Sequence, residues 1–239
     1  MSKALDSIAT DGNVNQEQVW VIVPAYNESD QLGQTLELLC QKFPNVVVVD
    51  DGSTDSTSAV SLRFSVFLLR HSVNCGQGAA LQTGIDFALQ KGAEILVTFD
   101  ADGQHCVEDI EPLIEPIRTL DSDIVFGSRF LGTTEGLPWT RWIILKLGVF
   151  FTGLLSGMWM TDTHNGLRAF SRHAAQKIRI TISDMAHASE IIDQVRRQGL
   201  SYCEVPVTVK YNPKTIAKGQ SSWNSLRIAI SLVLQKFVR

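Results

Sequence analysis

The sequence is poor in cysteine and in charge. Only four of its 239 residues are cysteine, and they are widely spaced with no C-x-x-C pair, which argues against a disulfide framework and a structural zinc site. Charged residues make up 19% of the chain, below the usual ~25%. With a net charge of −4, binding of nucleic acid through overall charge is disfavoured. Residues 1–18 contain no apolar run of the signal-peptide type, so they predict a loose N-terminal tail on a cytoplasmic protein.

Short apolar runs alternate with stretches of helical spacing. The runs are rich in β-formers and predict buried strands over residues 19–23, 46–49, 66–69, 94–99 and 124–126. Helices are expected between them, over residues 30–42, 56–63 and within 76–91. Pro112 and Pro116 are expected to break up the stretch before the last strand. This alternation predicts an α/β fold with a largely parallel central sheet.

Polar residues gather where three of these strands end. They occupy residues 24–28 after the first strand, 50–55 after the second and 100–105 after the fourth. Ligands of parallel α/β sheets bind beyond the carboxyl ends of the strands. The three clusters therefore predict one ligand site at this edge of the sheet.

Asp100 and Asp102 give the sharpest chemical signal. Two carboxylates one residue apart, in a loop leaving a buried strand, can converge on Mg²⁺ or Mn²⁺, which favour carboxylate, phosphate and water oxygens. The alternative is an Asp-rich turn whose side chains cap backbone groups. The neighbouring clusters favour the metal. His105 is either a further member of this site or a hydrogen-bonded loop residue.

The second cluster, residues 50–55, contains three aspartates. One aspartate at a strand end can hold a ribose hydroxyl or a base N–H, and the others, Asp55 above all, are expected to cap the following helix. The next loop contains Gly76 and Gly78 but has Leu81 where a dinucleotide loop has its third glycine. A dinucleotide oxidoreductase and a P-loop enzyme are therefore disfavoured, although the glycines permit close backbone approach to a nucleotide.

Taken in order, these motifs resemble the family 2 glycosyltransferases, which have the GT-A fold. The matching runs lie at residues 23–28, 50–55, 74–78, 100–105, 127–130, 165–170 and 204–207. Asp-Ala-Asp-Gly-Gln-His at 100–105, Gly-Ser-Arg-Phe at 127–130 and Gly-Leu-Arg-Ala-Phe at 166–170 are most similar to the dolichol-phosphate mannose synthase-like branch. The resemblance covers residues 19–222 and implies one catalytic domain there, a nucleotide-binding Rossmann-like sandwich with a mostly parallel central sheet.

The resemblance implies an inverting transfer of one sugar from a nucleoside diphosphate sugar to a polyprenyl-phosphate or lipid-linked acceptor. Asp100 and Asp102 would hold Mg²⁺ or Mn²⁺ on the donor diphosphate, and Asp102 is counted among the catalytic residues. Arg129 and Arg168 would neutralise a phosphate of donor or acceptor, the alternative for each being a salt bridge to a nearby aspartate. The residues implied in donor binding are Pro24, Tyr26, Glu28, Asp51, Gly76, Asp100, Ala101 and Lys218.

Glu190 is the candidate for a general base. A hydroxyl acceptor needs a carboxylate to take its proton, whereas a phosphate acceptor is already anionic and needs none. Glu190 stands about where many relatives carry an acidic residue on the acceptor side, and it could equally face solvent on a helix. Two other functions therefore stay open. One is a cytoplasmic transferase to a hydroxyl of a glycan or other acceptor with Glu190 as base, and the other is a nucleotide-sugar-binding protein without activity.

Two apolar stretches point to a membrane surface. Residues 142–160 have an uncharged core of 14 residues, 147–160, which is short of the ~20 that a spanning helix needs. Residues 223–239 predict an amphipathic C-terminal helix with basic residues that can meet anionic lipid. A peripheral enzyme at the inner face of the membrane is favoured. The alternative is that these stretches pack on the domain, on another copy in an oligomer or on a partner membrane protein.

Overall fold

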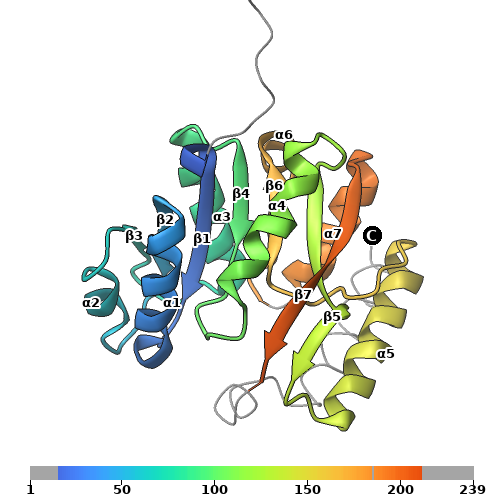
Figure 1. Ribbon diagram of the computed structural model, residues 1–239, viewed down its shortest axis with the longest axis horizontal. Coiled ribbons are helices and arrows are strands. Elements are labelled where there is room, and N and C mark those ends of the chain that lie inside the picture. Colours follow the sequence, from blue (N-terminus) through green and yellow to red (C-terminus); the bar gives the residue numbers. More distant parts are fainter. Residues whose placement is uncertain (1–15, 185, 212–239) are drawn as a thin grey trace, which may run out of the picture.

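A seven-stranded sheet runs through the protein (Figure 1). The computed structural model describes residues 16–184 and 186–211. The strands are β1 (Val19–Ala25), β2 (Asn45–Asp50), β3 (Phe67–Arg70), β4 (Ile95–Thr98), β5 (Ile124–Glu135), β6 (Arg168–Ser171) and β7 (Tyr202–Lys210). Their order is β3-β2-β1-β4-β6-β5-β7, and neighbours are parallel except that β6 runs antiparallel to both β4 and β5. The predicted α/β fold with a mostly parallel sheet is confirmed.

Helices cover both faces of this sheet. α1 (Ser29–Lys42) and α4 (Ile110–Arg118) pack on one face, and α3 (Gln77–Gln90), α6 (Arg172–Lys177) and α7 (His187–Gln198) pack on the other (Figure 1). α2 (Thr57–Ser61) lies at one end of the molecule and α5 (Trp139–Ser156) at the opposite end. The described residues also form two short 3-10 helices, η1 (Gln16–Gln18) and η2 (Val107–Asp109).

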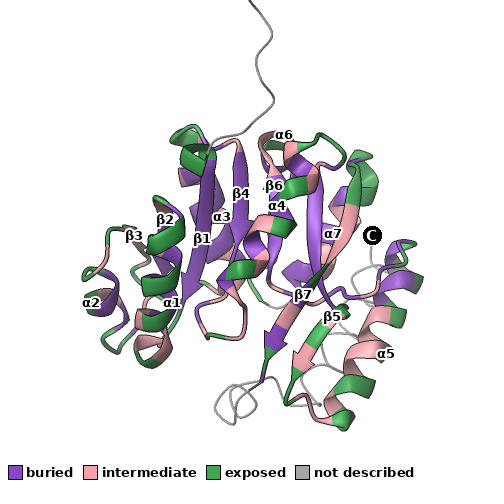
Figure 2. Ribbon diagram, viewed as in Figure 1, coloured by how far each residue is buried: buried purple, intermediate pink, exposed green. Residues whose placement is uncertain are grey.

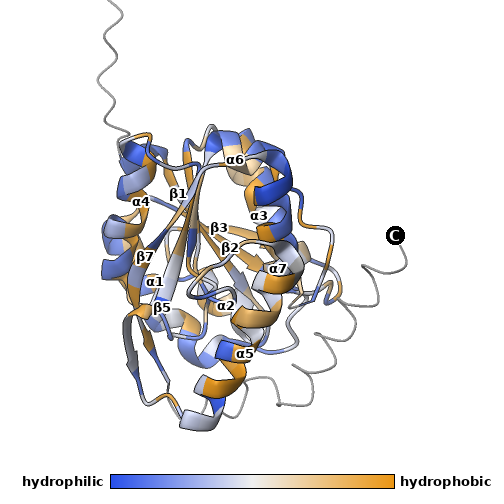
Figure 3. Ribbon diagram, turned by 90° about the vertical axis from the view of Figure 1, so that its right-hand side faces the viewer, coloured by the Kyte–Doolittle hydropathy of each residue, from blue (hydrophilic) through white to orange (hydrophobic). Residues whose placement is uncertain are grey.

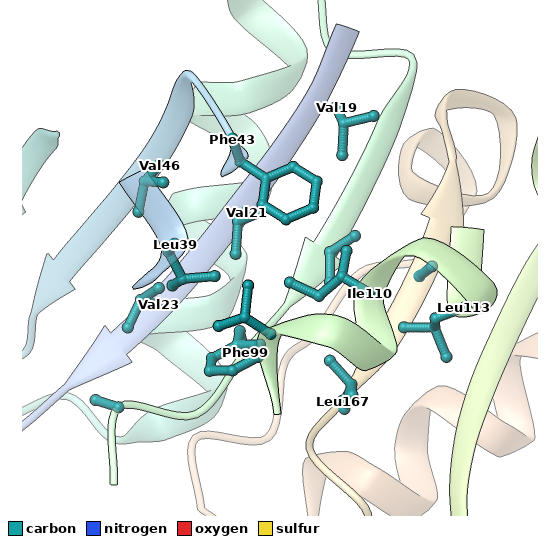
Figure 4. Close-up of a cluster of buried hydrophobic side chains, with 14 of the residues drawn as sticks. Val19, Val21, Val23, Leu39, Phe43, Val46, Phe99, Ile110, Leu113 and Leu167 are labelled. Carbon is teal, nitrogen blue, oxygen red and sulfur yellow. The ribbon is translucent and has the colours of Figure 1, made fainter. Parts of the chain in front are cut away.

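The two-sided burial of β1 explains why an unbroken apolar run forms a central strand. Val19, Val21 and Val23 join the core beneath α1 and α4 (Figure 4). Trp20 and Ile22 point the other way, into the core shared with α3, α6 and α7. Successive side chains of a strand face opposite sides, and both sides are buried here (Figure 2), which favours apolar residues at every position of β1.

The stretch that contains Pro112 and Pro116 is helical, so the expectation that these prolines break it up is wrong. Pro112 is the third residue of α4, where a backbone N–H has no helical acceptor. Pro116 lies inside the helix and removes one helical hydrogen bond. The apolar face of α4 outweighs this loss, because its isoleucine and leucine side chains are buried against the sheet.

β5 is longer than expected, and β6 and β7 have no counterpart in the apolar pattern. β5 continues past residue 126 to Glu135, because its second half pairs with β7 beyond an irregularity between Ser128 and Thr133. In that half the burial alternates residue by residue, and the hydroxyls of Thr133 and Thr208 lie 3.0 Å apart. Pairing between segments that are distant in the sequence therefore sets these strands.

Several expectations fall outside the described residues. These are the part of the tail before residue 16, the donor-binding role of Lys218, and the amphipathic helix over residues 223–239. Of the expected catalytic domain, 19–222, the described residues reach Tyr211. The last residues of the expected tail, Gln16–Gln18, form η1.

Candidate functional site

The three polar clusters meet at the carboxyl edge of β1, β2 and β4, as predicted. The Asp51 N–H donates to the carbonyl of Ala25 at the end of β1 over 2.9 Å. The Asn27 N–H donates to Ser53 Oγ over the same distance, so the loops after β1 and β2 hold each other. β4 pairs with the other side of β1, and the loop that begins at Asp100 leaves the same edge.

Asp51 is buried and is hydrogen-bonded to the glycine loop, residues 74–78. Its carboxylate accepts the backbone N–H groups of Cys75 (2.9 Å) and Gly76 (2.7 Å), and His71 Nδ1 lies 2.7 Å from Oδ1. Gly76 has a φ of 94°, a left-handed conformation that favours glycine. The structure thus brings together two predicted donor-binding residues, Asp51 and Gly76. It adds His71, for which no motif supplied a signal.

Asp51, His71 and Cys75 place three potential metal-ligand atoms within 4.8 Å of one another. Both ring nitrogens of His71 already have partners, because Nε2 lies 3.0 Å from Thr83 Oγ1. The pairing of the ring with Asp51 accounts for the clustering by hydrogen bonding alone. We therefore assign no cation to this group.

Asp50 and Asp55, the other two aspartates of the second cluster, accept hydrogen bonds from backbone N–H groups. Asp50 accepts the Ser53 N–H (2.9 Å), and Asp55 accepts the N–H of Thr57 (2.9 Å) in the first turn of α2. Burial alone would raise the pKa of Asp55, but hydrogen bonds from Thr57 and Ser29 lower it to about 2. Asp55 therefore has the capping role that its position predicted.

Asp100 is surrounded by hydrogen-bond donors and positive charge. Gln77 Nε2 donates to its Oδ1 (3.0 Å), and His105 Nε2 lies 3.2 Å from Oδ2. Burial would raise the pKa of Asp100, but His105, Arg168 and His187 together lower it. Asp100 is therefore an anion at neutral pH, and His105 is a hydrogen-bonded loop residue that orients it.

Asp102 lies in the same loop, and its pKa is shifted in the opposite direction to that of Asp100. Its Oδ1 accepts the Gln104 N–H (3.0 Å). Burial, followed by the negative charge of Asp100, raises the pKa of Asp102 to about 6, and Glu28 adds to this shift. A divalent cation would replace this repulsion by attraction, so the two carboxylates fit Mg²⁺ or Mn²⁺.

Binding of Mn²⁺ is expected to weaken as the pH falls below about 6, the pKa of Asp102. The cation needs an ionised carboxylate, so each pH unit below this pKa should lower the apparent affinity by up to about tenfold. In the metal-free protein the same shift lowers the free energy of unfolding as the pH rises from about 4 to about 6, because the folded state then binds more protons than the unfolded state. Calorimetric titration in two buffers of different ionisation enthalpy measures the affinity and the released proton. A constant affinity from pH 5 to pH 7 would contradict the raised pKa.

Gly166 lies against the Asp100 carboxylate. A Cβ atom at this position would come within 2.6 Å of Asp100 Cγ and 2.8 Å of Oδ1, whereas ordinary contacts begin at 3.4 Å. The Thr98 hydroxyl at the end of β4 donates to the Gly166 carbonyl over 2.7 Å. The Gly166 backbone is therefore held in place and packs directly against the Asp100 carboxylate. Gly166 belongs to a run matched by the family resemblance, but no role was predicted for it.

The two predicted arginines are buried in different surroundings. Arg168 is 2% exposed, and its Nε and Nη1 have no hydrogen-bond partner among the described residues. Burial lowers its pKa to about 10, and Asp100 opposes this shift. Arg129 forms the alternative that the sequence left open, an ion pair with Asp162 (Nε to Oδ2, 2.6 Å), and its Nη1 donates to the Tyr211 hydroxyl (2.5 Å). A phosphate contact stays a prediction for both arginines.

Glu190 lies in the first turn of α7, with its carboxylate turned toward the preceding segment. The Thr181 N–H lies 3.1 and 3.0 Å from the two carboxylate oxygens, and the Ile182 N–H donates to Oε2 (3.0 Å). His187, in the same turn, is buried, and burial lowers its pKa to about 4, so it is neutral at pH 7. The role of Glu190 as a base stays a prediction.

Of the other residues predicted to bind the donor, Pro24, Tyr26, Glu28 and Ala101 lie at the same edge. Pro24 is buried as the second-last residue of β1, and Ala101 is buried between Asp100 and Asp102 in the sequence. Tyr26 is 45% exposed directly after β1. It therefore offers an aromatic surface to a ligand at this edge.

An exposed apolar stripe runs along α5. Large apolar side chains recur every three or four residues along this helix and are 40–74% exposed. Figure 3 shows hydrophobic residues along α5. The α5 stripe consists of Trp139, Ile143, Leu147, Phe150, Phe151 and Leu154. Among the described residues, no helix has the length and apolar character needed to cross a membrane.

Sequence comparison places this chain among enzymes that transfer sugars. The family profile described as Glycosyl transferase family 2 matches residues 20–179. The UDP-N-acetylglucosamine–dolichyl-phosphate N-acetylglucosaminyltransferase of Methanococcus voltae is 32% identical over 91% of this chain and 96% of its own. The polyprenol monophosphomannose synthase of Mycolicibacterium smegmatis is 30% identical over 93% of this chain and 88% of its own.

Structural comparison agrees with the sequence. The crystal structure of glucosyl-3-phosphoglycerate synthase from Mycobacterium tuberculosis, in complex with Mn²⁺, UDP and glucosyl-3-phosphoglycerate, superposes with a TM-score of 0.67. The match covers 90% of this chain and 80% of that chain at 17% sequence identity. At this identity the likeness establishes the fold.

Proposed function

Because the chain belongs to glycosyl transferase family 2 and is a glycosyltransferase with the GT-A fold, we propose that it moves one sugar, with inversion, from a nucleoside diphosphate sugar to a polyprenyl phosphate. The observation that carries the proposal is the pair Asp100 and Asp102 at the carboxyl edge, next to the loop that holds Asp51. The names of the two relatives differ in the sugar and share a polyprenyl-phosphate type of acceptor.

The donor would bind with its diphosphate at the aspartate pair. Asp100 and Asp102 would hold Mg²⁺ or Mn²⁺, which when bound offsets the charge that develops on the leaving diphosphate. Gln77 and His105 keep Asp100 oriented through their hydrogen bonds to its two oxygens. Tyr26 supplies an aromatic surface for the base.

We place the acceptor phosphate near Arg168 and Arg129, and this acceptor does not require a general base. Arg168 lowers the pKa of Asp100 and keeps two guanidinium nitrogens without partners, so it provides fixed positive charge for a phosphate. Arg129 would contribute charge from the position in which Asp162 holds it. Since a phosphate oxygen is already anionic, the transfer needs no base. This agrees with Glu190, whose carboxylate is occupied by backbone donors.

The membrane surface supplies such an acceptor, and α5 is the proposed point of contact. Its stripe exposes tryptophan, phenylalanine and leucine side chains that suit an interfacial position at the inner face of the membrane. Lys146 on the same helix lies 3.7 Å from the centre of the Phe130 ring and adds a positive charge near this surface. An oligomer or a partner membrane protein is the alternative cover for the stripe.

The proposal is tested by incubating the purified protein with radiolabelled UDP-N-acetylglucosamine, UDP-glucose or GDP-mannose and vesicles that contain a polyprenyl phosphate. We expect one donor to yield a labelled product that extracts into organic solvent, and EDTA to abolish its formation. Label found only on a soluble glycan would favour the hydroxyl-acceptor function with Glu190 as base. Donor binding without any transfer would favour a nucleotide-sugar-binding protein.

Replacing two residues of the α5 stripe, Leu147→Glu together with Leu154→Glu, is expected to lower vesicle binding by more than about tenfold, because each buried leucine contributes about 1.5–3 kcal/mol. Vesicle sedimentation measures the bound fraction. Leu62→Glu is the matched control, since Leu62 is 71% exposed and lies just after α2, at the opposite end of the molecule. Equal binding of both variants would exclude α5 as the contact surface.

A further inference from the structure

We propose that Glu190 is a positioning residue for the donor site. In this role its carboxylate braces residues 181–183 against the glycine loop, and the glycine loop in turn holds Asp51 and presents Gln77 to Asp100. This inference rests on the proposed function, because it assigns the loop to the donor. It differs from the role of a base, which the sequence suggested for Glu190.

The Glu190 carboxylate accepts hydrogen bonds from the backbone of the preceding segment, residues 181–183. The N–H groups of Thr181 and Ile182 both point at it, at 3.0–3.1 Å, and the Thr181 hydroxyl donates to Oε1. Hydrogen bonds to a charged acceptor are about twice as strong as neutral ones, so this segment is firmly attached to α7. The residue just before this segment is attached to α3, because the Ile180 N–H donates to Gln82 Oε1 (2.7 Å).

The braced segment lies directly on the two glycines of the loop. The Gly78 N–H donates to the Ser183 carbonyl over 2.9 Å. A Cβ atom at Gly78 would overlap the Ile182 carbonyl oxygen and come within 3.1 Å of its carbon, and one at Gly76 would lie 2.9 Å from the Ser183 carbonyl carbon. Both glycines are therefore required by the segment that Glu190 holds, and a shift of that segment would reach the loop.

The glycine loop transmits this position to both parts of the donor site. Gly76 donates its N–H to Asp51 (2.7 Å), and the next residue, Gln77, donates its side-chain amide to Asp100 (3.0 Å). Every step from Glu190 to these two aspartates is a direct hydrogen bond or backbone contact. Loss of the brace should therefore loosen the donor site without removing any group that touches the reacting atoms.

The same contacts speak against proton abstraction by Glu190. A general base must reach the acceptor hydroxyl within hydrogen-bond distance and have a lone pair to receive its proton. Each Glu190 oxygen already faces two donors, from Thr181 on one side and from Thr181 and Ile182 on the other. To act as a base, Glu190 would have to release the segment that it holds.

The first test compares Glu190→Gln with Asp193→Asn, a change on the same helix in a carboxylate that pairs with Arg197 (2.7 Å). For Glu190→Gln we expect the KM for the donor to rise about tenfold, as for loss of one or two charge-assisted hydrogen bonds, with kcat changed less than about threefold and an unchanged pH–rate profile. Asp193→Asn should behave like the unaltered protein, and Thr181→Val should raise KM in the same direction. A kcat lower by 100-fold or more at unchanged KM, with one limb of the pH profile lost, would overturn the proposal and identify a base.

The second test does not depend on turnover. Hydrogen exchange of the amides of residues 76–78 should be about tenfold faster in Glu190→Gln than in Asp193→Asn, and Gly78→Ala should weaken UDP or GDP binding less when combined with Glu190→Gln than when made alone. If the unaltered protein transfers no sugar, the proposed function fails while this exchange measurement still decides the brace. Equal exchange in the two variants would overturn the inference.

Discussion

Asp102→Asn is expected to lower sugar transfer by about three orders of magnitude, similar to the loss of a group that stabilises charge directly in a transition state. The substitution preserves the size of the side chain and the oxygen that accepts the Gln104 N–H. It removes the charge that, together with Asp100, would bind the cation. Because burial and Asp100 already raise the pKa of Asp102, the asparagine should relieve repulsion and leave the metal-free protein at least as stable.

Thermal unfolding with and without Mn²⁺ and a nucleoside diphosphate separates these effects. The unaltered protein should be stabilised by the ligands together, since a ligand that binds only the folded state raises its apparent stability. Asp102→Asn should lose this increase, whereas Asp121→Asn, which changes an exposed carboxylate near Thr119, should retain it. Full transfer by Asp102→Asn, or by the unaltered protein in EDTA, would refute the role of the cation.

Gly166→Ala is expected to lower transfer by at least about 100-fold and to weaken Mn²⁺ binding, although the added group is a single methyl. Its Cβ would enter the space of the Asp100 carboxylate, at 2.6 Å from Cγ. The hydrogen bond from Thr98 holds the backbone in place, so the side chain of Asp100 must move instead. Overpacking of this kind typically costs 1–3 kcal/mol, and a ligand displaced by about 1 Å loses most of its effect.

The matched control is Gly33→Ala on α1, where the new Cβ would meet Val60 Cγ1 at an ordinary 3.6 Å. That change should leave Mn²⁺ binding unaltered and raise the stability slightly, because alanine favours a helix by about 1 kcal/mol over glycine. Combining Gly166→Ala with Asp100→Ala should recover the stability that Gly166→Ala loses, since the clash is then gone. Normal Mn²⁺ affinity in Gly166→Ala would show that packing against Gly166 does not fix the position of the Asp100 carboxylate.

The strands β1, β2 and β4, and the meeting of their polar ends, could be predicted from the sequence because local pattern determines them. Each strand is an apolar run buried on two faces, and each is followed at once by its polar cluster. Parallel pairing then puts these clusters at one edge. The capping role of Asp55 was likewise local, because its partner Thr57 is two residues away.

The parts that could not be predicted depend on tertiary contacts rather than on local sequence pattern. Whether Arg129 meets a phosphate or an aspartate was open in the sequence, and the structure pairs it with Asp162 in another loop. The engagement of Glu190 depends on how the segment before α7 folds back on the helix. The helix through Pro112 and Pro116 forms because burial of its apolar face exceeds the local penalty of proline.

The antiparallel strand β6 has a consequence for the order of folding. It lies between β4 and β5 although it follows both in the sequence, so neither can be joined to the other until β6 has been inserted. Such pairing closes a long loop and belongs to the slow part of folding. Gly166, just before β6, reaches Asp100 only at that step. A cation bound there would therefore slow unfolding more than it would speed folding.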